Sequence, residues 1–163
     1  MQFNPTGMYR REFTIRPEWK RKRIILYVGA VKSNLMVWVN GSYVGYGTDS
    51  KLSSEFDITP FLRPNGKNLV AMKVMRWEVS NYLEDQDMWR LSGIQRDCYL
   101  LAQNPLHIEN VVLNPELDST YCNGSLAVQL SLNRLSEKSK VGVEVVLKDG
   151  QTVLSGKRRI WIE

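Results

Sequence analysis

Histidine and cysteine are scarce in this sequence, which contains one histidine and two cysteines. A Ser/His/Asp triad or a multi-histidine metal site would depend on His107, which has no motif around it, so we interpret it as structural. Cys98 and Cys122 lack the close spacing of a zinc or redox motif, and two cysteines do not make a disulfide framework. We expect both to be free thiols, which leaves the compartment undefined.

Long apolar runs are also missing. No stretch is long and apolar enough to span a membrane, and residues 1–13 carry Arg10, Arg11 and Glu12 where a signal peptide would be apolar. Hydrophobic residues still make up 43% of the chain, which is enough for a packed core. These features predict a soluble globular protein with no membrane partner.

The net charge of +5 comes largely from two basic clusters, residues 20–23 and 157–159. Basic clusters can bind nucleic acid, but no nucleic-acid motif accompanies these two. We therefore favour a solvated loop and a solvated strand end over nucleic-acid binding, and we expect no nucleic-acid partner.

Most segments have the composition of strands. They are rich in Val, Ile, Leu and aromatic residues and are separated by Gly, Pro, Asn or Asp; they cover residues 23–30, 34–39, 68–77, 98–102, 108–113, 125–132 and 141–148. Between Leu126 and Leu132 apolar and polar residues alternate strictly, as in a sandwich strand with one wet face. The sequence therefore predicts an all-β protein.

Two dipeptides predict tight hairpins, because Asn-Gly and Asp-Gly tolerate the positive φ angles of a type I′ turn. Asn40-Gly41 is expected to join residues 35–39 to 42–46, and Asp149-Gly150 to join residues 141–148 to 152–155.

A domain boundary is predicted at the polar, proline-bearing residues 103–105. Residues 1–104 suit one β-sandwich. Residues 105–163 supply only about four predicted strands, whereas an immunoglobulin-like sandwich needs about seven. We expect this second domain to be incomplete, with an exposed edge strand that could form a homodimer.

The densest group of polar and aromatic residues lies at 81–90. Asp85 and Asp87 would sit about 7 Å apart on an extended segment and point the same way, so they do not form a glycosidase pair that flanks a bond. A sugar site instead combines hydrogen-bonding side chains with an aromatic platform, and the candidates for it are Asn40, Asp85, Asp87, Trp89 and Arg90. Asp87 is also a candidate cation ligand, although a single carboxylate makes a weak site.

Each candidate also has a structural interpretation. An acidic loop is usually solvated, Arg90 can pair with a neighbouring carboxylate, and the Asn-Gly turn alone accounts for Asn40. The aromatic residues are expected in the core more often than in a sugar platform; they are Trp38, Tyr43, Tyr46, Trp77, Tyr82, Trp89 and Trp161.

Four long motifs give the chain a specific resemblance. They occur at residues 4–9, 38–47, 49–57 and 82–94 and read NPTGMY, WVNGSYVGYG, DSKLSSEFD and YLEDQDMWRLSGI. In this order they resemble the sugar-binding domain of glycoside hydrolase family 2 β-galactosidases, and the remainder resembles more loosely the start of the immunoglobulin-like domain that follows. The resemblance implies a jelly-roll-like β-sandwich followed by a partial immunoglobulin-like β-sandwich.

The resemblance also implies a function. The parent enzyme would be a retaining hydrolase of terminal β-galactosides in the bacterial cytoplasm or periplasm, with its catalytic glutamates in a barrel domain that this chain lacks. By motif position, Asn40 and Asp87 resemble the residues of this family that contact the galactosyl group. The resemblance also implies that Asp87 binds a sodium ion. Trp89 and Arg90 match by position and are expected to support the sugar contact. Magnesium would bind elsewhere in the parent.

Three functional hypotheses therefore remain. The first is a non-catalytic β-galactosidase fragment that needs the barrel as its partner and binds galactose or a β-galactoside weakly or not at all alone. The others are a free-standing carbohydrate-binding module and a structural β-sandwich that recruits a partner through its edge strands.

Overall fold

The computed structural model of the protein describes residues 3–83, 87, 89–134, 141–153 and 158–162. Most of these residues lie in strands, which confirms the all-β prediction. The chain divides into two compact units, residues 1–104 and 105–163, and the division falls in the polar stretch around Pro105. In the described residues no helix is long and apolar enough to cross a membrane.

The first unit contains nine strands and one short helix among its described residues. They are β1 (Thr6–Thr14), β2 (Arg23–Val28), β3 (Val31–Lys32), β4 (Asn34–Val39), β5 (Ser42–Gly47), β6 (Ser54–Asp57), β7 (Lys67–Met75), α1 (Ser80–Leu83), β8 (Gly93–Ile94) and β9 (Cys98–Gln103). Short 3₁₀ turns cover Pro17–Trp19 and Thr59–Phe61.

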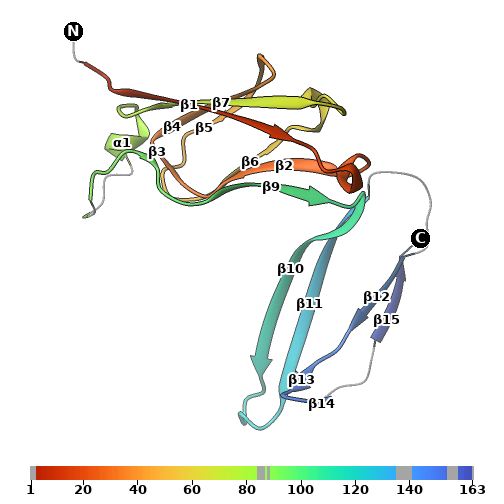
Figure 1. Ribbon diagram of the computed structural model, residues 1–163. Coiled ribbons are helices and arrows are strands. Elements are labelled where there is room, and N and C mark those ends of the chain that lie inside the picture. The colour runs from red at the N-terminus through yellow and green to blue at the C-terminus, as the bar shows by residue number, and fades with distance from the viewer. Residues whose placement is uncertain (1–2, 84–86, 88, 135–140, 154–157, 163) are drawn as a thin grey trace. The chain divides into compact units, whose positions relative to one another are not determined.

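Two antiparallel sheets form the layers of this unit, one with the strand order β1-β7-β4-β5 and the other with the order β6-β2-β9 (Figure 1). Strands β3 and β8 form a separate pair. Apart from the β4–β5 hairpin, the strands of the two sheets follow one another in alternate layers along the chain, as the predicted jelly-roll-like sandwich requires. The core lies between the two sheets because alternate residues of each strand face inward. Its buried residues are Ile24, Leu26, Val28, Val31, Leu35, Val37, Val39, Phe56, Ile58, Val70, Met72 and Val74.

The turn at Asn40-Gly41 is confirmed. Asn40 has φ 52° and Gly41 has φ 87°, so both central residues have the positive φ of a type I′ turn. Val39 and Ser42 are register partners on either side of it. The turn therefore fixes the pairing of β4 with β5.

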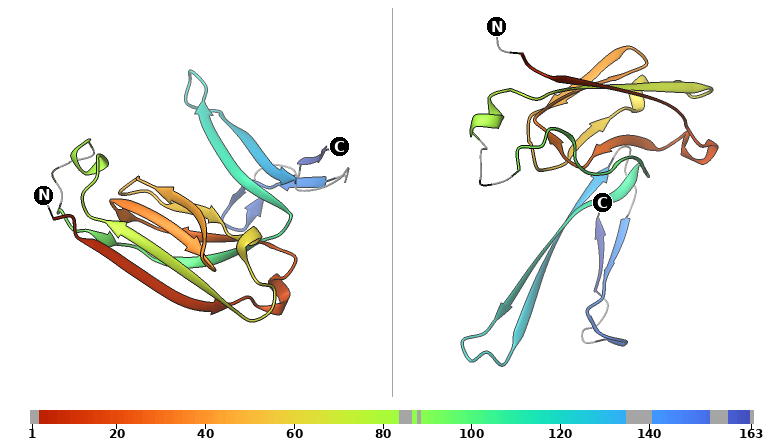
Figure 2. Two further views of the ribbon diagram at one scale, coloured as in Figure 1. Left: turned by 90° about the horizontal axis from the view of Figure 1, so that it is seen from above. Right: turned by 60° about the vertical axis from the view of Figure 1, so that its left-hand side comes forward.

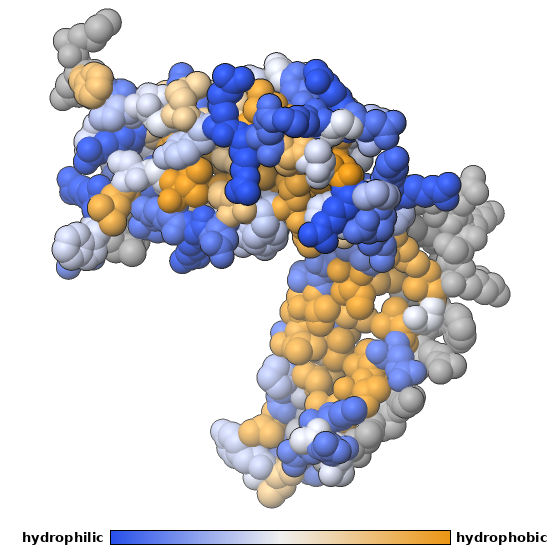
Figure 3. All heavy atoms as spheres, viewed as in Figure 1, coloured by the Kyte–Doolittle hydropathy of each residue, from blue (hydrophilic) through white to orange (hydrophobic). Residues whose placement is uncertain are grey.

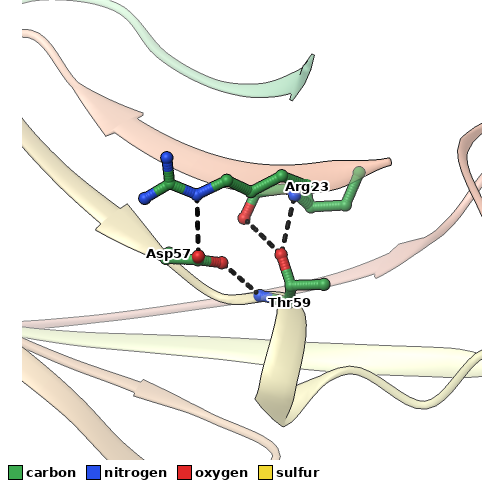
Figure 4. A network of polar contacts seen from close by, with 4 residues as sticks. Arg23, Asp57 and Thr59 are labelled. Atoms are coloured by element: carbon green, nitrogen blue, oxygen red, sulfur yellow. Dashed lines mark hydrogen bonds and ion pairs between the residues drawn. The ribbon is translucent and has the colours of Figure 1, made fainter. Parts of the chain in front are cut away.

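A polar network connects β2 with the end of β6 (Figure 4). Arg23 Nε lies 2.8 Å from Asp57 Oδ2, and the Thr59 amide donates to Asp57 Oδ1 at 3.0 Å. The amide of Ile24 donates to Thr59 Oγ1 at 2.8 Å. Partial burial alone would raise the pKa of Asp57, but the hydrogen bonds from Thr59 and Arg23 outweigh it and hold that pKa below its usual value.

The second unit contains β10 (Leu106–Leu117), β11 (Gly124–Arg134), β12 (Val141–Val145), β13 (Lys148–Asp149), β14 (Thr152–Val153) and β15 (Arg158–Ile162). Strands β10 and β11 form one long hairpin (Figure 2). Apolar side chains are gathered on its surface (Figure 3), and Ile108, Leu113 and Leu117 are each more than half exposed. Among the residues whose burial is described here, Val143 is the only buried hydrophobic one. This unit therefore builds little core of its own.

The predicted hairpin at Asp149-Gly150 is wrong in its details. Strand β12 ends at Val145 and pairs with β15, while β13 and β14 make a separate two-stranded ribbon. Asp149 is the last residue of β13 and pairs with Thr152, so the turn residues are Gly150 and Gln151. Of these, only Gly150 has a positive φ, 55°, which is the pattern of a type II′ turn with glycine at its first position.

Candidate functional site

The candidate sugar-binding residues lie on the segment that connects β7 to β8. After Met75 the chain passes through Arg76, Trp77 and α1, and it returns to pair with β3 at Gly93. This connecting segment, residues 76–92, is called the 76–92 loop. It begins where β7 ends, so a rigid sheet holds its first residues in place.

Three side chains, two of them distant in sequence, fix the start of the 76–92 loop. Asn4 Nδ2 donates to the Trp77 carbonyl at 2.8 Å, and the Trp77 amide donates to Asn4 Oδ1 at 2.9 Å. Ser33 Oγ donates to the Arg76 carbonyl at 3.1 Å, and Asn81 Nδ2 donates to the same oxygen. Asn4 opens the first of the four motifs, but nothing in that motif predicts this role. The structure shows that Asn4 positions the loop backbone.

The loop encloses a small hollow of about 30 Å³. Its lining residues are Lys32, Arg76, Trp77, Asn81, Tyr82, Arg90 and Ser92. The Arg76 guanidinium lies over the Trp77 ring, 4.8 Å from its centroid, and the Trp77 and Tyr82 rings are 6.4 Å apart. Three of the lining side chains are cationic. The hollow thus joins an aromatic wall to a positively charged one.

Three predicted site residues share this loop. Asp87, Trp89 and Arg90 are all exposed, and Arg90 also lines the hollow. Trp89 is 85% exposed, which rules out a core position for it in this unit. Asp85 lies outside the described residues. The structure therefore presents a carboxylate, an indole and a guanidinium within four residues of chain.

The expected core position also fails for other aromatics. Tyr43, Tyr46 and Tyr82 are each more than half exposed. Trp38 and Trp77 are partly buried, and the side chain of Trp161 lies outside the description. The first three rings are exposed because each lies in the loop or on the edge strand β5, where no second layer covers it.

Asn40 does not join the other predicted site residues. It lies where β4 ends and pairs through its backbone with Leu69, near the start of β7, whereas the 76–92 loop follows the end of that strand. The six residue steps from Leu69 to Met75 span about 20 Å in an extended strand.

The side-chain amide of Asn40 is used inside the protein. Asn40 Nδ2 donates to the Phe61 carbonyl and to Asn68 Oδ1, both at 2.8 Å, and Asn40 Oδ1 accepts from the Leu69 amide at 3.0 Å. Both donor hydrogens and one acceptor position are occupied. We therefore interpret Asn40 as a structural residue, as the turn alone allowed, and do not include it in the proposed sugar site.

The described residues do not complete a cation site at Asp87. They contain no group of three or more His, Cys, Asp or Glu side chains that could hold a metal ion. A sodium ion needs several oxygen ligands, and Asp87 by itself supplies one carboxylate. No step of the proposed function is therefore assigned to a metal.

Comparison with known proteins identifies the first unit. Residues 1–105 match the sugar-binding domain of glycosyl hydrolases family 2. The chain belongs to this family. β-Galactosidases from Vibrio cholerae and Pseudoalteromonas haloplanktis are 41% and 43% identical to it, each over 93% of the chain.

The chain spans only 15% of the Vibrio protein and 14% of the Pseudoalteromonas protein. A solved structure, the β-glucuronidase of Bacteroides uniformis, has the same fold with a TM-score of 0.81 over 99% of this chain and 20% of its own, at 24% identity. The β-sandwich predicted from the motifs is therefore the fold of this family 2 domain.

Proposed function

We propose that this chain is a non-catalytic sugar-binding part of a β-galactosidase, and that its 76–92 loop contacts the galactosyl group of the substrate. The single observation that carries the proposal is the identity of more than 40% to β-galactosidases over 93% of the chain. The catalytic carboxylates would lie in the rest of such an enzyme, of which this chain matches about one-seventh.

The loop residues supply chemistry that suits a sugar. The Asp87 carboxylate accepts hydrogen bonds from hydroxyl groups, and such charge-assisted bonds are shorter and stronger than neutral ones. Trp89 offers an exposed indole face for the apolar face of a sugar ring. Arg90 supplies donors for ring or hydroxyl oxygens. These groups would hold the galactosyl ring while residues of another domain carry out hydrolysis.

A chimera tests this role directly. The matching segment of the Vibrio cholerae β-galactosidase is replaced by this chain, and hydrolysis of a chromogenic β-galactoside is measured. We expect an active enzyme in which Asp87→Asn lowers kcat/KM by about 10- to 100-fold, the effect of losing a charge-assisted hydrogen bond.

Asp97→Asn is the matched control, because Asp97 is also exposed in the first unit but lies at the start of β9. We expect it to leave kcat/KM within about twofold. Equal effects of the two substitutions would contradict a sugar contact at Asp87. Hydrolysis of the same substrate by the chain alone would contradict the non-catalytic assignment.

Exposed aromatic side chains favour a second candidate, a module that binds carbohydrate by itself. Tyr82 and Trp89 are 68% and 85% exposed on the same loop. NMR titration of the chain with galactose and lactose, with and without sodium, separates the two candidates. Saturable shifts that Trp89→Ala removes would support the free-standing module, and a dependence on sodium would support Asp87 as its ligand. No response would mean that sugar contact requires the remaining domains.

A further inference from the structure

The two sheets of the first unit meet closely along one side. The edge strands there are β5 and β6, and a Cβ on Gly45 would lie 3.1 Å from the Phe56 ring. A Cβ on Gly47 would lie 2.7 Å from Ser54 Oγ. This side of the sandwich is therefore closed. On the other side the edge strands are β1 and β9 (Figure 1).

A largely apolar cavity of about 300 Å³ lies between β1 and β9. Of the described residues that line it, Arg11 is the only charged one. Arg11 pairs with Val70, and Leu100 pairs with Leu26, so both strands share their inner faces with buried core residues. Cys98 lines the cavity and is exposed, and the space-filling view from this side shows apolar side chains between the two layers (Figure 3). The cavity therefore reaches from the core to the open side of the sandwich.

The number of strands accounts for the cavity. The sheet that contains β1 has four described strands, whereas the sheet that contains β9 has three. A double-sheet jelly roll has eight strands in all. Because the sandwich is closed at β5 and β6, the strand without an opposite neighbour is β1. The space opposite β1 lies beside β9, which pairs only with β2 among the described strands.

The composition of β9 differs from that of the other edge strands. Proteins protect exposed edges with charged residues, proline or bulges, because unpaired N–H and C=O groups there can pair with another chain. Strand β5 pairs with β4 through a register shift, β1 contains Arg10, Arg11 and Glu12, and β6 contains Glu55 and Asp57. Strand β9 reads CYLLAQ, with no charge or proline, and its pairing with β2 is regular. It has the composition of an interior strand.

We propose that an extended peptide segment pairs with the free edge of β9 as an eighth strand and places alternate apolar side chains in the cavity. The six residues of β9 can pair with about six residues of such a segment, of which about three point to one face. The cavity has about twice the volume of an engineered cavity that holds benzene, so about two or three aliphatic side chains fit.

The segment would belong to the same polypeptide. The similar β-galactosidases extend far beyond the part that this chain matches, which is 15% of one and 14% of the other. This source rests on the proposed function, whereas the binding edge rests on the cavity and on β9. A second copy of the chain fits less well. If it placed its own β9 here, it would bring a four-stranded sheet into the place of β1.

Overlapping synthetic peptides test the proposal. They cover the Vibrio cholerae β-galactosidase outside the part that this chain matches, and each has about twelve residues, twice the length that β9 can pair. Binding of each labelled peptide to the full chain is measured by fluorescence polarisation. We expect one peptide, or neighbours that share its sequence, to bind saturably. Apolar residues should alternate in it, and a scrambled peptide of the same composition should not bind.

The Cys98 thiol reports whether a bound peptide lies in the cavity, because it is exposed and lines that cavity. With the peptide at ten times its Kd, alkylation of Cys98 by N-ethylmaleimide should slow by about tenfold. Cys122 is the internal control, since it is also exposed but lies between β10 and β11 in the second unit. Its alkylation rate should change by less than about twofold.

Leu100→Trp fills the cavity from β9 itself. It should weaken peptide binding by at least about tenfold, because the larger side chain takes the volume that the peptide uses. Leu101→Trp is the matched control, because the next residue in a strand points to the opposite face, and it should alter the affinity by less than about twofold. If Leu100→Trp does not fold, Cys98→Trp places the same ring at the exposed end of the cavity.

Three results would overturn the proposal. They are the absence of any peptide that binds better than its scrambled form, a bound peptide that leaves Cys98 alkylation unchanged, and equal losses in the Leu100 and Leu101 variants. Protection of Cys98 that grows with the concentration of the chain alone would assign the edge to a second copy and would also overturn it. None of these measurements involves sugar or hydrolysis, so their failure is distinct from failure of the Asp87 chimera test.

Discussion

Replacement of Asn40 by alanine should destabilise the first unit strongly, although the residue lies in a surface turn. The substitution removes the hydrogen bonds to Phe61, Asn68 and Leu69, which join the β4–β5 turn to Phe61 and to the first residues of β7. It also places alanine at a φ of 52°, which asparagine tolerates better than other residues with a Cβ.

The magnitude follows from these two effects. Three hydrogen bonds at a net value of about 1 kcal/mol each give about 3 kcal/mol, and the positive φ adds about 1 kcal/mol for alanine. Asn40→Gly loses the same hydrogen bonds but has no Cβ, so it should cost about 3 kcal/mol or slightly less. The difference between the two variants therefore isolates the backbone term.

Urea unfolding followed by tryptophan fluorescence measures both variants, with the slope of the transition as a check on cooperativity. A loss below about 1 kcal/mol for Asn40→Ala would refute the structural role of the amide. The same variants separate this role from sugar contact. We therefore place Asn40→Gly in the β-galactosidase chimera described above. Under conditions where this variant is folded, we expect its kcat/KM to equal that of the unsubstituted chimera.

Three further predictions concern other parts of the chain. Because the folded-state pKa of Asp57 is lowered, its contribution to stability should be present above about pH 4 and disappear as the pH falls further. Urea midpoints measured at several pH values should fall at low pH for the wild type and change less for Asp57→Asn. Because the ion pair with Arg23 is partly exposed, the difference in unfolding free energy between the two proteins should stay below about 1 kcal/mol. Gly29→Ala should lower the free energy of unfolding by about 1–3 kcal/mol, because a Cβ there would lie 2.8 Å from a side-chain atom of Arg96. Gly124→Ala is the control and should be nearly neutral, so equal thermal midpoints of the two variants would contradict this prediction. Asp118→Ala should increase amide hydrogen exchange in the turn between β10 and β11, because the Asp118 carboxylate accepts hydrogen bonds from the amides of Thr120 and Cys122. Unchanged exchange would show that these hydrogen bonds do not order the turn.

The loop hollow changes how the candidate site is understood. Sequence motifs direct attention to Asp87, Trp89 and Arg90 because they lie together in the chain. The structure adds Lys32 and Asn4, which are distant in sequence but reach the same loop. The described lining of the hollow therefore comes from β3 as well as from the loop itself.

The sequence alone determined the features that depend on short-range physics. The alternation of apolar and polar residues follows from the two-residue period of a pleated strand. It predicted a strand between Leu126 and Leu132, which lies within β11. The turn at Asn40-Gly41 followed from the φ preferences of two adjacent residues. The four motifs sufficed for the family.

Only the tertiary structure decided the rest, because the deciding contacts join residues far apart in the chain. The Asp-Gly dipeptide predicted a turn centred on Asp149 and Gly150, but the register of β13 with β14 moved its centre to Gly150 and Gln151. The role of Asn40 depended on partners 21, 28 and 29 residues away. Lys32 and Arg76 line one hollow because β3 and the end of β7 lie side by side, and no periodicity in the sequence encodes that proximity.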